Sequence, residues 1–181
     1  MGESRHSRAE KPTIICAEGG VCKAAGPGKA GCPARLPRMT SPRLVVLDSQ
    51  AIFDWLVFRN PVCAGWATLL AGPEWKWIFT SETKAEFDHV AAKGFGPARP
   101  VPWDAVVDGW TRLAHEVPVP APLGADRRIG CSDPDDQKFI DLAIAAGAHT
   151  LVSRDKALLK LRRKALERHG LRIVTPMQWA S

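Results

Sequence analysis

The run Leu44–Leu47 is uninterruptedly apolar and is followed at once by Asp48. Four apolar residues without the alternation of a half-buried strand indicate a β-strand that is buried on both faces. A second short run, Thr150–Ser153, leads in the same way to Asp155. Strands of this kind belong to parallel sheets, in which helical crossovers connect one strand to the next. This pattern constrains the fold more than any other feature of the chain.

The intervening residues supply such crossovers. We predict helices over 51–58, 62–70, 81–93, 103–113, 133–147 and 156–169, and a short terminal helix from 175. We predict further strands over 75–80 and 171–174, and a weaker one over 115–119. Ser81 is the expected N-cap of its helix, and Asp133-Pro134 is expected to open another. Alternating strands and helices predict an α/β fold with a mostly parallel sheet that is covered on both faces.

Residues 1–38 differ from the rest in composition. They are rich in Gly, Ala, Pro, Lys and Arg without a sustained period of 2 or 3.6, so we predict a disordered extension. Met39 directly precedes the first strand, and we interpret it as the true start of one domain over 39–181. The extension has seven Lys/Arg and three Glu, which is most of the formal net charge of +6. This balance weakly favours an anionic partner.

Composition excludes several classes of protein. The five cysteines are odd in number and irregularly spaced, which argues against a disulfide framework and against a zinc site. No stretch approaches the roughly 20 apolar residues of a membrane span. No apolar secretory signal is present at the N-terminus, so we expect a cytoplasmic protein that does not enter a membrane.

Acidic residues follow both of the strongest strand predictions. Because the carboxyl ends of parallel strands share one edge of a sheet, we expect Asp48 and Asp155 to lie close together. Each also suits the N-cap of the helix that follows, and the sequence leaves that alternative open. Converging carboxylates repel one another and are tolerated when they bind a hard cation, which prefers oxygen ligands. The pattern therefore points to metal-assisted chemistry.

The segment Asp133–Asp136 supplies a third acidic group. Its first residue precedes Pro134 and suits a helix N-cap. Asp136 lies three residues before Phe139, on the inward face of the predicted helix. An inward carboxylate is costly unless a cation or a donor meets it. We therefore select Asp136 as the functional residue of this segment, with Asp135 as its substitute.

Residues 43–180 resemble the PIN-domain family, specifically the toxin components of toxin–antitoxin systems. The motifs that carry the resemblance are Leu44–Gln50, Ser81–Phe87, Asp133–Ala143, Ala146–Lys156 and Val174–Pro176. It implies a three-layer α/β/α fold and one or two Mg²⁺ or Mn²⁺ ions held by four acidic residues. Those four positions match Asp48, Glu86, Asp136 and Asp155. Without the resemblance, Glu86 reads as a solvated residue on a helix surface.

Three further positions are compared with the family motifs. The first motif of the family is usually Asp-Thr-Asn, and here it is Asp48-Ser49-Gln50. Ser49 keeps the hydroxyl, whereas the longer Gln50 puts the polar contact of that position in doubt. Ser153 matches a position where members of the family often carry Thr.

Basic residues outside the acidic group are candidates for contacts with the phosphates of RNA. The candidates are Arg127, Arg128, Arg154, Lys156, Lys160, Arg162 and Arg163. The alternative is that those in the predicted helix 156–169 form its solvated outer face. Similarly, Trp55, Trp66 and Phe58 provide either core packing, which we favour, or a surface for a homodimer or an antitoxin.

The function implied by the resemblance is a metal-dependent endoribonuclease that cleaves single-stranded RNA, as the toxin partner of a small antitoxin protein. A nucleic-acid-binding or regulatory PIN-like domain with weak or no catalysis is the alternative. A third reading, a phosphatase that forms an aspartyl-phosphate, is disfavoured because such enzymes usually carry Asp-x-Asp after the first strand. The segment Asp48-Ser49-Gln50 lacks the second Asp.

Overall fold

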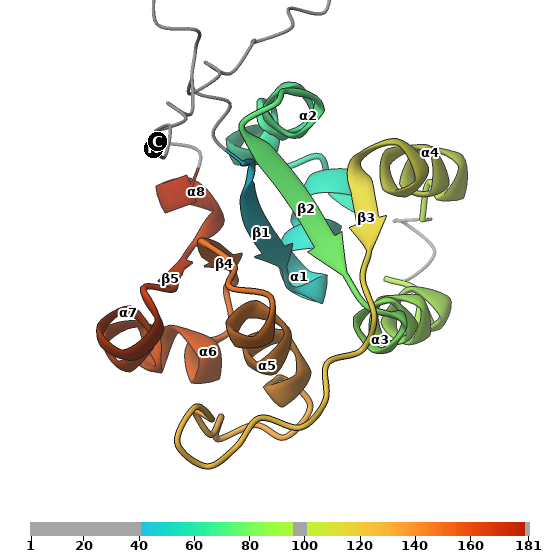
Figure 1. Cartoon of the computed structure of the whole chain (residues 1–181). Helices are drawn as coiled ribbons and strands as arrows, with labels where there is room; N and C mark the ends of the chain where they lie inside the picture. The colour runs from blue at the N-terminus through green and yellow to red at the C-terminus, as the bar shows by residue number, and fades with distance from the viewer. Residues whose placement is uncertain (1–40, 96–100, 180–181) are drawn as a thin grey trace, which may run out of the picture. The chain divides into compact units, whose positions relative to one another are not determined.

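The computed structural model describes residues 41–95 and 101–179. The predicted extension 1–38 and the proposed start at Met39 lie outside the described residues. Five parallel strands form one sheet in the order β3-β2-β1-β4-β5, and Figure 1 shows β1 between β2 and β4. The strands are β1 (Arg43–Leu47), β2 (Trp75–Phe79), β3 (Ala114–Glu116), β4 (Thr150–Val152) and β5 (Arg172–Val174). The predicted α/β class is confirmed, and every strand pair in the described sheet is parallel.

Helices connect the strands and cover the sheet. They are α1 (Ser49–Ile52) with the π-helical turn η1 (Phe53–Val57), the 3₁₀ turn η2 (Pro61–Cys63), α2 (Trp66–Ala71), α3 (Ser81–Lys93), α4 (Trp103–Leu113), α5 (Gln137–Ala145), α6 (Lys156–Lys160), α7 (Arg162–His169) and α8 (Pro176–Trp179). None of the helices in the described part of the chain is long and apolar enough to span a membrane.

Alternate residues of the central strand β1 belong to two separate hydrophobic cores. Val45 and Leu47 pack with side chains of the first four α-helices, whereas Val46 packs with α5, α6 and α7. Successive side chains of a strand point to opposite faces of a sheet, so these two cores are the two faces. The arrangement is the expected three-layer α/β/α fold, with β1 buried from both sides.

Tryptophan side chains dominate the first core. Trp77 is fully buried, and its ring centroid lies 4.8 Å from that of Trp110 and 5.8 Å from that of Trp55. Trp66 packs against Trp55 at 5.8 Å. The favoured reading of these residues as core aromatics is confirmed. The alternative of a homodimer or antitoxin surface is wrong for Trp55 and Trp66, because both are buried, while Phe58 is 37 % exposed.

The first two helical predictions were wrong in their boundaries. The expected helix 51–58 is an α-helical turn that begins at Ser49 and continues as η1, because Asp48 caps it from the end of β1. The expected helix 62–70 is divided into η2 and α2. Asn60 starts η2 by accepting a hydrogen bond from the backbone N–H of Val62 at 3.1 Å.

The predicted N-cap of α3 was wrong by one residue. Thr80, and not Ser81, accepts a hydrogen bond from the backbone N–H of Thr83 at 3.3 Å, and Thr83 Oγ1 accepts one from the N–H of Thr80 at 3.0 Å. This reciprocal capping box uses Thr in place of the usual Glu or Gln. Thr80 leaves the strand to make it, so β2 ends at Phe79 rather than at the predicted residue 80.

Two later helices also differ from prediction. Asp133-Pro134 does not open α5, because Asp133 Oδ1 instead accepts a hydrogen bond from the N–H of Asp135 at 2.9 Å and holds a turn. The helix begins only at Gln137. The predicted helix 156–169 is interrupted at Leu161, between α6 and α7. At the interruption, the backbone N–H of Leu161 donates to the carbonyl of Leu158 at 2.9 Å, which makes a tighter turn than that of an α-helix.

We predict that Thr80→Ala lowers the free energy of unfolding by about 1 kcal/mol, because it leaves the backbone N–H of Thr83 without its acceptor. Urea denaturation followed by tryptophan fluorescence measures the change. Thr111→Ala, at an exposed position inside α4, is the matched control and should have little effect. Equal stability of Thr80→Ala and the unchanged protein would contradict the role of the capping box.

Candidate active site

Asp48 stands directly after β1, where the order of strands reverses between β1 and β4. In open α/β sheets ligands bind outside the carboxyl ends of the strands at this point. The residue is only 3 % exposed, and its carboxylate accepts a hydrogen bond from the N–H of Ala51 at 2.6 Å. Burial raises the pKa of Asp48 to about 7, although hydrogen bonds from Ser153 and from backbone N–H groups oppose the shift.

Asp155 occupies the corresponding position after β4. Its Oδ1 accepts a hydrogen bond from the N–H of Ala157 at 2.5 Å, so Asp155 caps α6 as Asp48 caps α1. Both N-cap readings therefore hold. Capping uses an oxygen of each carboxylate and does not prevent the two groups from facing one another, since the charge of Asp155 contributes to the raised pKa of Asp48.

Ser153 connects these two aspartates. Its side chain is fully buried, its hydroxyl donates a hydrogen bond to Asp48, and its Oγ accepts one from the backbone N–H of Asp155 at 2.8 Å. A hydroxyl can donate and accept at once, which is what this position requires. Ser153 therefore holds the two carboxylates in place relative to each other.

Asp136 completes a group of three carboxylates. It lies at the N-terminal end of α5, makes no capping bond there, and has a buried Oδ2 that lacks a hydrogen-bond partner. Burial raises the pKa of Asp136 well above its usual range. The charges of Asp155, Asp133 and Asp48 and a hydrogen bond with the Asp155 side chain add to the shift. The structure thus brings Asp48, Asp136 and Asp155 together.

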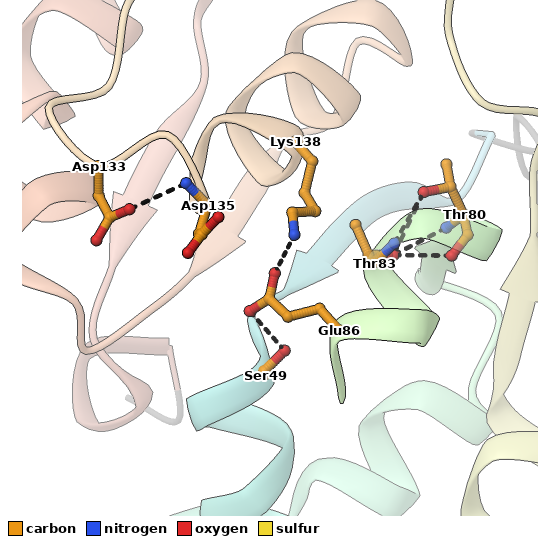
Figure 2. Close-up of polar contacts among 7 residues, drawn as sticks. All are labelled: Ser49, Thr80, Thr83, Glu86, Asp133, Asp135 and Lys138. Carbon is orange, nitrogen blue, oxygen red and sulfur yellow. Dashed lines mark hydrogen bonds and ion pairs between the residues drawn. The ribbon is translucent and has the colours of Figure 1, made fainter. Parts of the chain in front are cut away.

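Asp135, the predicted substitute, points elsewhere. Its side chain is exposed, and Figure 2 shows it beside Asp133 in the turn that precedes α5. Of the two neighbouring aspartates, only Asp136 has a buried carboxylate oxygen without a partner.

Glu86, on α3, has partners other than the three aspartates. Its Oε1 accepts a hydrogen bond from the hydroxyl of Ser49 at 3.2 Å, and its Oε2 is 2.5 Å from Nζ of Lys138 (Figure 2). Ser49 follows Asp48 in the chain, so it links Glu86 to the group. In the part of the chain that the structure describes, no three His, Cys, Asp or Glu side chains stand close enough to hold one metal ion.

Lys138 was missed at the level of the sequence. It follows Asp136 by two residues on α5, and its side chain is about one quarter exposed. The motif gave no signal for it, because a lysine on a helix reads as a surface residue. In the fold, it neutralises Glu86 at the edge of a strongly acidic site.

The acidic residues fit a hard divalent cation. The carboxylates of Asp48, Asp136 and Asp155 are oxygen donors that repel one another, and one oxygen of Asp136 is buried without a partner. A cation such as Mg²⁺ or Mn²⁺ prefers such ligands and would favour their ionised forms. In the described structure these three side chains do not stand close enough to hold one ion together, so a cation would have to draw them closer, and Glu86 could join them only if it separates from Lys138.

Asp54 is a second residue that the sequence did not reveal. It is 6 % exposed on η1 and accepts two hydrogen bonds from Nη1 of Arg154, at 3.1 and 3.0 Å. Arg154 is one of the predicted RNA contacts, and it separates Ser153 from Asp155 in the chain. The ion pair therefore fastens the loop after β4 to the first helical segment.

The other basic candidates lie on the surface. Arg127 donates a hydrogen bond to the carbonyl of Ile144 at 3.3 Å, while Arg163 forms only a long, exposed ion pair with Glu167 at 4.0 Å. Exposed side chains are also found at Arg128, Lys156, Lys160 and Arg162. Their exposure is compatible both with RNA contact and with a solvated helix face.

Gln50 is exposed and follows Ser49 in the chain.

Residues 44–157, more than half of the chain, match the family model described as the PIN domain. The chain belongs to the PIN-domain family. PIN domains are generally nucleases and generally use divalent metals.

One solved structure similar to this PIN domain is described as VapBC2 from Rickettsia felis bound to a DNA fragment from their promoter. The two chains are 16 % identical with a TM-score of 0.49, and the match covers 73 % of this chain and 98 % of the other. No curated protein sequence matches the chain.

We predict that Asp136→Asn stabilises the metal-free PIN domain at about pH 8 and has a smaller effect at about pH 5. The pKa values of Asp48 and Asp136 are raised in the folded state. The folded protein therefore binds more protons than the unfolded chain above the ordinary Asp pKa, and it loses stability as the pH rises toward about 7. Asn removes one of the repelling charges.

Thermal unfolding in EDTA at the two pH values measures this effect. Asp135→Asn is the control, since that carboxylate is exposed and should change stability equally little at both. A loss of stability in Asp136→Asn at the higher pH would contradict the proposed repulsion.

Proposed function

We propose that this protein is a metal-dependent endoribonuclease that cleaves single-stranded RNA. The observation that carries the proposal is the convergence of Asp48, Asp136 and Asp155 at the reversal of strand order, where the pKa values of Asp48 and Asp136 are raised. A group of mutually repelling carboxylates is unfavourable in the fold. Perturbed pKa values of this kind cluster at functional sites.

A bound Mg²⁺ or Mn²⁺ would supply an activated water and would stabilise the charge that develops on a phosphoryl oxygen. The chain's own residues have separate tasks. Asp48, Asp136 and Asp155 would hold the cation, and Ser153 keeps Asp48 and Asp155 in position relative to each other. Glu86, fixed by Ser49, either joins the ligands or orients the attacking water.

Basic side chains recruit the polyanionic substrate to this acidic site. Arg154 and Lys156 flank Asp155 in the chain, and the exposed arginines of α7 extend the positive surface. Contacts of Lys and Arg with phosphates give affinity without sequence preference and weaken as the salt concentration rises. The proposed substrate class is therefore a phosphodiester chain, and these basic residues contact its phosphates rather than its bases.

The proposal extends to the role of a toxin with a small antitoxin protein as its partner, acting in the cytoplasm. Its support is the motif resemblance over 43–180 to the toxin branch of PIN domains. Co-purification of this protein with the product of a small neighbouring gene, and inhibition of RNA cleavage by that product, would test the role separately from the chemistry.

We predict that Asp48→Asn and Asp136→Asn each lower the rate of RNA cleavage on the order of 100-fold or more, because each removes a proposed ligand charge. The assay incubates the full chain with a labelled single-stranded RNA in Mg²⁺, Mn²⁺ or EDTA. Asp135→Asn is the matched control and should keep most of the activity. Cleavage that survives EDTA or both substitutions would contradict the metal-dependent mechanism.

One observation favours the alternative of a nucleic-acid-binding domain with weak catalysis. The ammonium of Lys138 lies 2.5 Å from Oε2 of Glu86, so this carboxylate forms an ion pair with Lys138 instead of being available to a metal ion. Under the nuclease proposal, the ion pair between Lys138 and Glu86 would break when a cation binds. Under the alternative, the ion pair would remain.

We predict that Lys138→Gln increases the affinity for Mn²⁺ several-fold, because Glu86 then has no competing cation. Calorimetric titration of the metal measures the change. Lys84→Gln is the control, since Lys84 pairs with Asp88 and not with Glu86. Unchanged affinity in Lys138→Gln would show that Glu86 does not take part in metal binding and would favour the alternative.

A further inference from the structure

A pocket of about 320 Å³ adjoins one side of the candidate site. Two of its lining residues, Ser49 and Glu86, belong to the site already described. The remainder of its wall includes Gln50, Phe53, Phe58 and Arg154. Anything that fills the pocket therefore contacts two residues of the candidate site.

Phenylalanine rings form the inner wall of the pocket. Phe95 packs edge-on against Phe53 at 5.0 Å and against Phe58 at 4.9 Å between ring centroids. Phe53 in turn stacks on buried Phe87 at 4.5 Å, which fixes the wall to the core. Phe58 stays 37 % exposed. The wall is thus a rigid aromatic surface that a second flat ring can cover.

The charges around the pocket disfavour an anionic occupant. Arg154 is the one basic residue among its described lining residues, and Asp54 already neutralises it through two hydrogen bonds. Glu86 adds a carboxylate at the side nearest the acidic site. A phosphate would meet these acids, whereas a neutral aromatic ring would meet the phenylalanines.

Gln50 adds hydrogen-bonding capacity at the mouth of the pocket. Its side chain is exposed, and its amide offers two donors and one acceptor oxygen. A planar amide of this kind matches the donor and acceptor pattern on the edge of a nucleobase. The longer side chain at position 50, which departs from the family motif, is positioned to read such an edge.

We propose that this pocket binds one nucleobase of the RNA, from the nucleotide adjacent to the cleaved phosphate, with Phe58 as the stacking surface and Gln50 as the residue that selects the base. The inference rests on the proposed ribonuclease function. An RNA chain is favoured over a side chain of a protein partner because the pocket shares Ser49 and Glu86 with the acidic site. Its occupant is therefore continuous with the phosphate that the site would cleave.

The test uses a single-stranded RNA in which one abasic nucleotide is moved stepwise past the cleavage site. For the unchanged protein, kcat/KM for cleavage in Mn²⁺ should fall roughly tenfold at a single position, the size of one lost stacking contact. Fluorescence anisotropy in EDTA should show a loss of affinity at the same position. In Phe58→Ala the abasic and intact RNAs should be cleaved equally, because the contact is already absent.

Two further variants complete the design. Gln50→Ala, at an exposed position, should keep the sensitivity to the abasic nucleotide but lose the preference among the four bases at that position. Trp103→Ala removes an aromatic side chain that is 44 % exposed on α4, outside the pocket, and should behave as the unchanged protein.

The contradicting outcomes are distinct. RNA cleavage that no abasic position affects would overturn the base pocket and leave the ribonuclease proposal standing. Failure of the unchanged protein to cleave any RNA would overturn both. Phe58→Ala that keeps full discrimination of the abasic RNA but loses binding to a protein partner would assign the pocket to that partner instead.

Discussion

The pairing of β1 with β4 is the constraint on which the site depends. Leu47 and Val152 are partners in the parallel register, so the chain leaves the two strands side by side at the same edge of the sheet. That pairing places Asp48 and Asp155 within reach of each other, although they are far apart in sequence. Ser153 then fixes their relative position from inside the turn.

The carboxylates that result have two roles, which explains how the fold tolerates them. Asp48 and Asp155 cap α1 and α6, which stabilises the first turns of both helices. Burial raises the pKa values of Asp48 and Asp136, and the repulsion among these carboxylates adds to the shift. Local capping thus offsets part of the cost of concentrating these charges at one edge of the sheet.

Much of the fold and of the site was predictable from local pattern. The continuous apolar run of β1 identified a doubly covered strand, and the spacing of Asp136 from Phe139 identified an inward carboxylate. Boundaries were less predictable, as Thr80 and Gln137 show. The N-cap of a helix is the residue whose hydroxyl or carboxylate reaches a free backbone N–H group of the first turn. Neighbouring residues of the same type can compete for that N–H group. Lys138 and Asp54 were not predictable, because their partners come from other elements.

The sequence by itself determined the alternation of strands and helices, the carboxylates at the strand ends and the motifs of the PIN-domain family. Each of these depends on residues that are near neighbours in the chain. Only the tertiary structure decided that Glu86 pairs with Lys138, that Arg154 is held by Asp54, and that Gln50 borders an aromatic pocket. Each of these contacts joins separate elements across the edge of the sheet. Its existence therefore depends on how the layers pack, which no local pattern encodes.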